Sequence, residues 1–115
     1  MKKLTQEELN KKIESHNKWL DCFENSEKAD FSFCDLRNLD LSGYTLRCAN
    51  FFGANLMRSK LNNCNLNDVD FRNCELRDAD FFSSSLIRTD FRNSNVEIKK
   101  IKSINNTSNF SYFGE

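Results

Sequence analysis

The chain has 115 residues, and its 17 Lys and Arg side chains balance 17 Asp and Glu side chains, so the formal net charge is zero. This balance gives no electrostatic reason to expect a nucleic acid, a membrane surface or an acidic ligand as a partner. The length fits a single domain with a modest core. No apolar run could span a bilayer, and no apolar segment follows the lysines of the opening MKKLTQEELNKK, so we expect neither a membrane span nor a signal peptide.

The cysteine pattern bears on the compartment. The chain has five cysteines and no CxxC spacing. An odd number of cysteines in this arrangement is typical of reduced thiols rather than of a disulfide framework. We therefore expect a soluble protein of the cytoplasm.

Residues 1–28 predict an N-terminal segment built on a helix over residues 5–23. Thr5 and Glu8 have the spacing of a capping box. Four apolar residues recur on one face of this helix: Leu9, Ile13, Leu20 and Phe23. The segment that follows the helix is a short-period repeat, described below, which predicts a stack of coils. The open end of such a stack exposes core and unpaired backbone, so we expect the helix to cap it.

The same helix contains His16 and Trp19, which could contribute to a site or pack the helix onto the body. No second histidine and no acidic cluster accompanies them. Packing is therefore the favoured interpretation, and a metal role is not.

Residues 29–98 contain an uninterrupted repeat with a period of five. A large apolar residue occupies every fifth position: Phe31, Leu36, Leu41, Leu46, Phe51, Leu56, Leu61, Leu66, Phe71, Leu76, Phe81, Leu86, Phe91 and Val96. A mostly small residue stands two positions before each of them, and residues two apart in an extended chain share a face. The period fits a very short strand followed by a turn, repeated as a coil around an apolar axis.

The segments CANFF, GANLM and DADFF resemble the A(D/N)LxX unit of pentapeptide-repeat proteins, and HNKWL resembles an HxxWL segment that precedes the repeats in some members. This resemblance implies an all-β solenoid, a right-handed quadrilateral β-helix of about three and a half coils. It also implies that positions twenty apart stack, which places Phe31, Phe51, Phe71 and Phe91 in one column. An N-terminal α-helix and a short C-terminal segment would cap the coils.

The register breaks after Val96, so residues 99–115 are expected to form a C-terminal cap and tail. Ile98, Ile101 and Ile104 suggest a short helical or irregular piece. The aromatic side chains near the end are expected to dock on the body or on a second chain, in which case they would mediate self-association. They are Phe110, Tyr112 and Phe113.

No constellation of residues indicates catalysis. Within residues 29–98, most carboxylates stand one position before the large apolar residue of a pentad, where turn hydrogen bonding explains them. The single histidine has no readable nucleophile partner, no pair of residues has metal-ligand spacing, and three glycines form no phosphate-binding loop. We expect neither an enzyme nor a cofactor or metal.

The outward-facing positions of the pentads are more informative about function than the carboxylates, the histidine and the glycines. Phe52, Met57, Phe82 and Ile87 occupy a position that is polar in most other pentads. If positions twenty apart stack, Phe52 and Met57 lie next to Arg72 and Arg77 on a rigid scaffold. Aromatic, Met and Arg side chains together are typical of the centre of a protein interface. Scattered surface hydrophobes are the alternative interpretation. The candidate partner-binding residues are Phe52, Met57, Arg58, Arg72, Arg77, Phe82 and Ile87.

Two functional hypotheses remain open. The resemblance suggests a non-catalytic binding module, because some pentapeptide-repeat proteins act on DNA gyrase. Residues 29–98 hold ten acidic and eight basic side chains, a balance of only −2, so a phage-borne or bacterial inhibitor of another enzyme, such as a host defence nuclease, fits equally well. The alternative is a self-associating structural module, which could form a homodimer. Direct RNA or DNA binding is disfavoured because acidic residues interleave with the arginines.

Overall fold

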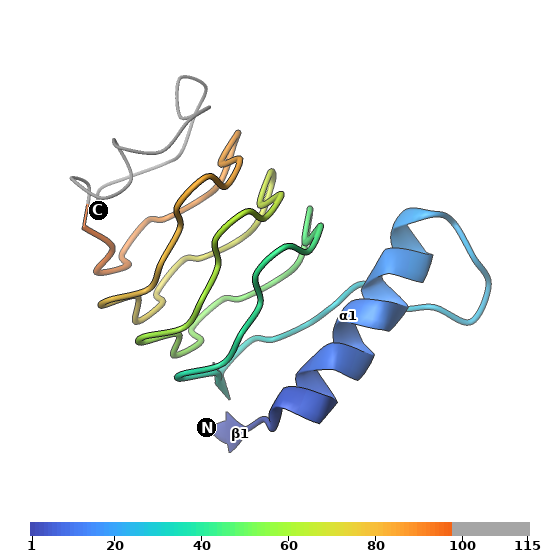
Figure 1. Cartoon of the computed structure of the whole chain (residues 1–115), viewed down its shortest axis with the longest axis horizontal. Coiled ribbons are helices and arrows are strands. Elements are labelled where there is room, and N and C mark those ends of the chain that lie inside the picture. The colour runs from blue at the N-terminus through green and yellow to red at the C-terminus, as the bar shows by residue number, and fades with distance from the viewer. Residues whose placement is uncertain (98–115) are drawn as a thin grey trace.

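A computed structural model describes residues 1–97 as a stack of coils with one helix across its N-terminal end (Figure 1). The regular elements are β1 (Lys2–Lys3), α1 (Gln6–Leu20) and β2 (Cys34–Asp35). The strands β1 and β2 pair in parallel. Within the described part of the chain, no helix combines the length and the apolar character that crossing a membrane requires.

Isolated parallel bridges between residues twenty apart hold the coils together, so one turn takes twenty residues and has four faces. Thr45, for example, bridges to Asn65, which bridges to Ser85. The first face comprises residues 29–33, 49–53, 69–73 and 89–93, and the second comprises 34–38, 54–58, 74–78 and 94–97. The third comprises 39–43, 59–63 and 79–83, and the fourth comprises 44–48, 64–68 and 84–88. The predicted all-β solenoid is confirmed.

A turn at the end of each pentad makes the corner. The N–H of Ala54 donates to the C=O of Phe51 at 2.9 Å, and Gly53 between them has a φ of +69°. The side chain one position before the core residue supports this turn by accepting the N–H two residues on, as Asp70 does from Arg72 at 2.9 Å. This is the turn role predicted for the carboxylates.

The core is the predicted apolar axis. Phe31, Phe51, Phe71 and Phe91 are fully buried and stacked, with ring centroids 4.9, 5.0 and 5.3 Å apart. Successive coils place identical side chains above one another, so aromatic rings can stack along the whole axis. Val96 still packs against this core, whereas Ile98, the last residue of the predicted repeat, and the predicted C-terminal cap and tail over residues 99–115 lie outside the described residues.

The helix begins as predicted and ends earlier than predicted. Thr5 and Glu8 form both bonds of the capping box. At the other end, Cys22 adopts a φ of +62° and the N–H of Phe23 donates to the C=O of Lys18 at 3.0 Å, which is a Schellman termination. The prediction that Phe23 lies on the packed helix face is wrong, because this reversal leaves its side chain 63% exposed.

The buried face of α1 lies against the first coil (Figure 1). Leu9 and Ile13 join the core cluster, and His16 is fully buried. The Nδ1 atom of His16 accepts the N–H of Ala29 at 2.9 Å, and its Nε2 atom lies 2.8 Å from the C=O of Arg47. These bonds require a neutral ring protonated at Nε2, and burial lowers the pKa of His16. His16 therefore packs the helix, as predicted.

Candidate protein-binding surface

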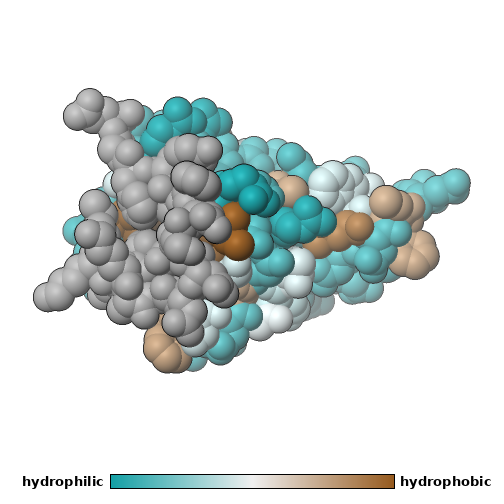
Figure 2. Space-filling view, turned by 90° about the horizontal axis from the view of Figure 1, so that it is seen from above, coloured by the Kyte–Doolittle hydropathy of each residue, from teal (hydrophilic) through white to brown (hydrophobic). Residues whose placement is uncertain are grey.

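The outward apolar side chains lie on the outer surface of the solenoid. The residue just before each of them already fills the core. Phe51 and Leu56 have no exposed surface, while the adjacent Phe52 and Met57 are half-buried. Figure 2 shows one face of the molecule, on which hydrophobic groups form small separate patches among hydrophilic ones. The core of the coil thus does not need Phe52 or Met57.

Phe52 is held between an arginine and a second aromatic ring. The guanidinium of Arg72, one coil further along, lies 5.1 Å from the ring centroid. The ring of Phe33 meets Phe52 edge-on at 5.6 Å. Arg72 is itself fixed by two bonds to Asp70, at 3.0 and 2.9 Å. The predicted contact between the apolar and arginine positions is present at Phe52.

Met57 and Arg58 form the adjoining part of the surface on the second face. The Nη1 atom of Arg58 lies 3.4 Å from the Sδ atom of Met57, and its Nε atom donates to Oδ1 of Asn38 at 2.9 Å. Arg58 occupies the turn position with a φ of +59°. Its side chain therefore runs along the wall beside Met57, where a partner could reach both.

The arginines of this surface are largely neutralised within the chain. Arg77 donates to both carboxylate oxygens of Glu75, at 2.9 and 3.2 Å. These bonds hold the pKa of Glu75 at about 2, so it stays ionised. Arg72 and Arg77, each paired with a carboxylate of the chain, thus offer oriented guanidinium edges rather than uncompensated positive charges.

Phe33 belongs to this surface, and the sequence reasoning missed it. It occupies the turn position with a φ of +55°, which is uncommon for a bulky residue, and its side chain is 59% exposed. Its ring lies over Gly53 of the next coil, where an added Cβ would stand 2.7 Å from the ring. The signal was available in the sequence, since the other turn positions carry no aromatic residue and a glycine follows twenty positions later.

The remaining predicted residues do not join this surface. Phe82 lies on the third face with 65% of its side chain exposed, and Ile87 lies half-buried on the fourth. The four apolar residues therefore lie on four different faces, with Phe52 and Met57 on one side of the solenoid and Phe82 and Ile87 on the other. The predicted self-association residues Phe110, Tyr112 and Phe113 lie outside the described residues.

The described residues offer little to bind a metal or to perform covalent chemistry. No group of three potential ligands occurs among them. The cysteines are all free, and three of them, Cys34, Cys64 and Cys74, are buried. Burial raises the pKa of Cys74 to about 12, and its Sγ atom donates to the C=O of Phe51 at 2.8 Å. Such a thiol stays protonated and poorly nucleophilic.

Comparisons with known proteins agree with this architecture. The family model described as pentapeptide repeat region matches residues 25–101. Among solved structures, the chain is similar to a pentapeptide repeat protein from the thylakoid lumen of Arabidopsis thaliana, with 32% identity and a TM-score of 0.60. That match covers 62% of this chain and 49% of the other, so this chain spans about half of that protein's length. No curated protein gives a significant match. The chain belongs to the pentapeptide repeat family.

Proposed function

We propose that this chain is a protein-binding module whose contact is the Phe52 surface, made of Phe33, Phe52, Met57, Arg58, Arg72 and Arg77. Pentapeptide repeat proteins are generally non-catalytic structural or protein-interaction modules. One observation carries the proposal. Phe52 points outward although Phe51 already fills the core behind it, and its ring is held between the guanidinium of Arg72 and the ring of Phe33.

The surface has the composition and the rigidity of an interface centre. Aromatic residues, Met and Arg are enriched in such centres. Phe52 is fixed by Arg72 and Phe33, and Arg72 is fixed by Asp70. Side chains that are held before binding lose less conformational entropy in the complex, which favours affinity.

The partner in this proposal is a nucleic-acid-processing enzyme of the topoisomerase or of the phage and host defence nuclease type, which the chain would inhibit or modulate. Support comes from the resemblance to pentapeptide-repeat proteins that act on DNA gyrase. The charge balance of −2 over residues 29–98 favours a contact through the Phe52 surface rather than through a strongly negative, DNA-like field.

The proposed setting is the cytoplasm of a bacterium or of a phage-infected cell. The five free cysteines suit a reducing compartment. Fractionation of cells that express the chain from its own gene tests this point, and recovery in an extracytoplasmic fraction would contradict it.

The test of the surface is the double variant Phe52→Ala/Met57→Ala. A partner is isolated with the wild-type chain, and its Kd is then measured for each variant. Loss of two interface anchors should weaken binding by at least about thirtyfold, or roughly 2 kcal/mol, while the variant stays folded. The matched control is Phe82→Ala/Ile87→Ala, on the opposite faces, which should bind like wild type. Equal binding by both variants would remove the Phe52 surface from the function.

Self-association is the second candidate, favoured by the exposure of Phe82. In this case the partner is another copy of the chain, paired through Phe82 or through Phe110, Tyr112 and Phe113. Size-exclusion chromatography with light scattering separates the two functions. A stable dimer that Phe82→Ala dissociates would support this candidate, and a monomer at all concentrations would exclude it.

We also propose the finer architecture: a right-handed coil of about three and a half turns in which α1 acts as an N-terminal cap. The burial of Leu9, Ile13 and His16 against the first coil supports the cap. Deleting residues 1–28 should expose that coil and cause aggregation. A truncated chain that stays monomeric with an unchanged melting temperature would contradict the cap, and an experimental structure would test the handedness.

A further inference from the structure

The first coil has an edge with no coil before it. On the fourth face, the C=O of Tyr44 accepts the N–H of Asn65 at 3.1 Å, and the N–H of Leu46 donates to the C=O of Asn65 at 2.8 Å. Successive backbone groups of a strand point to opposite edges. The N–H and C=O of Thr45 therefore point away from the second coil, toward α1.

On two of the other three faces, the second and the third, the N-terminal segment satisfies the equivalent groups. On the second face, β1 pairs with β2, and the N–H of Leu4 donates to the C=O of Asp35 at 3.2 Å. On the third face, the side-chain amide of Gln6 takes the place of a strand. Its Nε2 atom donates to the C=O of Asp40 at 2.7 Å, and its Oε1 atom accepts the N–H of Asp40 at 2.9 Å.

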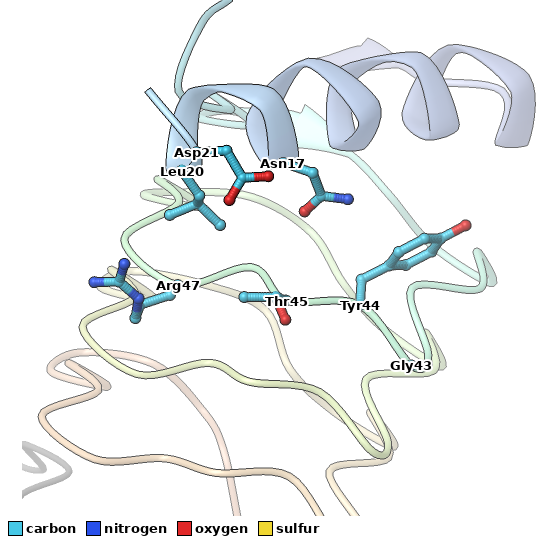
Figure 3. A pocket seen from close by; sticks show the side chains of 7 residues that line it. All are labelled: Asn17, Leu20, Asp21, Gly43, Tyr44, Thr45 and Arg47. Atoms are coloured by element: carbon cyan, nitrogen blue, oxygen red, sulfur yellow. The ribbon is translucent and has the colours of Figure 1, made fainter. Parts of the chain in front are cut away.

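The fourth face lacks such a partner. Within residues 1–97, neither the N–H nor the C=O of Thr45 has a backbone partner, because its bridge to the second coil uses the groups of Tyr44 and Leu46. A cavity of about 480 Å³ lies at this point between the end of α1 and the first coil (Figure 3). We call it the Thr45 groove; it is lined by Asn17, Leu20, Asp21, Tyr44, Thr45 and Arg47. Its size is within the range of ligand-binding clefts.

The walls of the groove carry opposite charges and an apolar patch. Figure 3 shows Asn17, Leu20 and Asp21 projecting from the end of α1 toward the coil that carries Thr45 and Arg47. Among the described residues, neither the Asp21 carboxylate nor the Arg47 guanidinium forms an ion pair within 4 Å; the guanidinium lies 3.9 Å from the Sγ atom of Cys48 and acts on Asp68 only at longer range. One negative and one positive side chain thus flank an unpaired strand edge.

We propose that the Thr45 groove binds an extended peptide segment of another protein. One residue of the segment exchanges hydrogen bonds with the N–H and C=O of Thr45, as the amide of Gln6 does at Asp40. A basic side chain beside it reaches Asp21 and an acidic one reaches Arg47. Strand addition to an open edge gives affinity through the main chain, and the flanking side chains give specificity. This site is separate from the Phe52 surface and does not depend on it.

Two tripeptides test the site: acetyl-Lys-Val-Glu-amide and acetyl-Glu-Val-Lys-amide, which cover both strand directions. In the free protein, the Thr45 amide should exchange with solvent much faster than the amide of Asp40. Titration at millimolar concentration should shift the Thr45 amide resonance in the NMR spectrum and slow its exchange, with at least one of the peptides. Acetyl-Ala-Val-Ala-amide should bind several-fold more weakly. Asp21→Asn should weaken binding of the charged peptide several-fold without loss of folding.

The decisive variant is Thr45→Pro, which removes the free N–H, and its matched control is Asn65→Pro, one coil below. Proline is tolerated where the strand N–H is unused and disruptive where it belongs to the ladder. Thr45→Pro should stay folded and lose peptide binding at least tenfold, whereas Asn65→Pro should melt at a markedly lower temperature. A slowly exchanging Thr45 amide, unchanged peptide binding by Thr45→Pro, or no shift with either charged peptide would overturn the proposal. The Phe52→Ala/Met57→Ala variant should bind the peptide normally.

Discussion

Two sets of phenylalanine side chains, one inside the coils and one on their outer surface, differ in what the fold requires of them. The inner column, which includes Phe51 and Phe71, is fully buried, and every coil adds one ring to it. The outer pair, Phe33 and Phe52, lies on the wall, and its neighbours are Arg72 and Gly53. The period of the repeat requires the column. Nothing in the period requires the pair.

The difference shows how a repeat protein separates stability from recognition. A core position is fixed by the positions twenty residues before and after it, so its side chain cannot change without affecting the stack. An outward position touches solvent and one or two neighbours, so it can be adapted to a partner at small cost to the fold. Substitutions at matched inner and outer positions test whether this division holds.

The largest expected effect separates an inner from an outer position on the third face. Leu61 has no exposed surface, whereas Asn62 is partly exposed. Leu61→Asp buries an unpaired carboxylate on the axis, which should prevent folding. Asn62→Asp should leave the fold intact. Circular dichroism and thermal melting measure both, and equal melting temperatures would rule out the inward position of Leu61.

A smaller effect is expected where α1 meets the first coil. His16→Gln disturbs the bonds to the N–H of Ala29 and the C=O of Arg47, and should cost about 1–3 kcal/mol at pH 7. Denaturant unfolding measures this loss. A variant as stable as wild type would mean that the two bonds contribute little.

The same histidine predicts a pH dependence. Because burial lowers the pKa of His16 in the folded chain, the unfolded chain takes up its proton first as the pH falls below about 6.5. The His16 contribution to the stability of the wild type should therefore be complete well above pH 6.5 and should decrease as the pH falls through about 6.5 toward the lower pKa of the folded chain. The His16→Gln variant should lack this decrease. An identical slope in both proteins would assign the dependence to other groups.

The smallest effect tests the outer pair itself. Gly53→Ala introduces a Cβ at positive φ and against the Phe33 ring, and should cost about 1–2 kcal/mol. In a Phe33→Asn background the ring is absent, so the same change should cost less. A double-mutant cycle in denaturant measures the coupling. No coupling would mean that Phe33 does not lie over Gly53 in solution.

The sequence alone predicted the features that repetition enforces. The axial residues, the aromatic column and the turn role of the carboxylates all follow from a five-residue period that holds over fourteen pentads. The capping box was predictable for a similar reason, because Thr5 and Glu8 are local partners. These features depend on the spacing of residues along the chain, so the order of the amino acids is enough to derive them.

Other features depend on contacts that no spacing encodes. α1 ends at a turn in which Cys22 adopts the left-handed conformation that a glycine usually adopts at a helix end. The bonds of Gln6 to Asp40 and of His16 to Ala29 depend on how the helix lies across the coil. Phe33 could have been noticed, but its contact with Phe52 requires the stacking of two coils.

The central claim is that the inner column holds the fold and the outer pair does not, and adjacent residues test it most directly. Phe51→Ala and Phe52→Ala remove the same side chain from neighbouring positions, and denaturant unfolding gives the free energy of each. Phe51→Ala leaves a cavity in the stack and should cost about 3–5 kcal/mol. Phe52→Ala loses one cation–π and one edge-on ring contact and should cost only about 1–2 kcal/mol. Equal losses, or a larger loss at Phe52, would contradict the account.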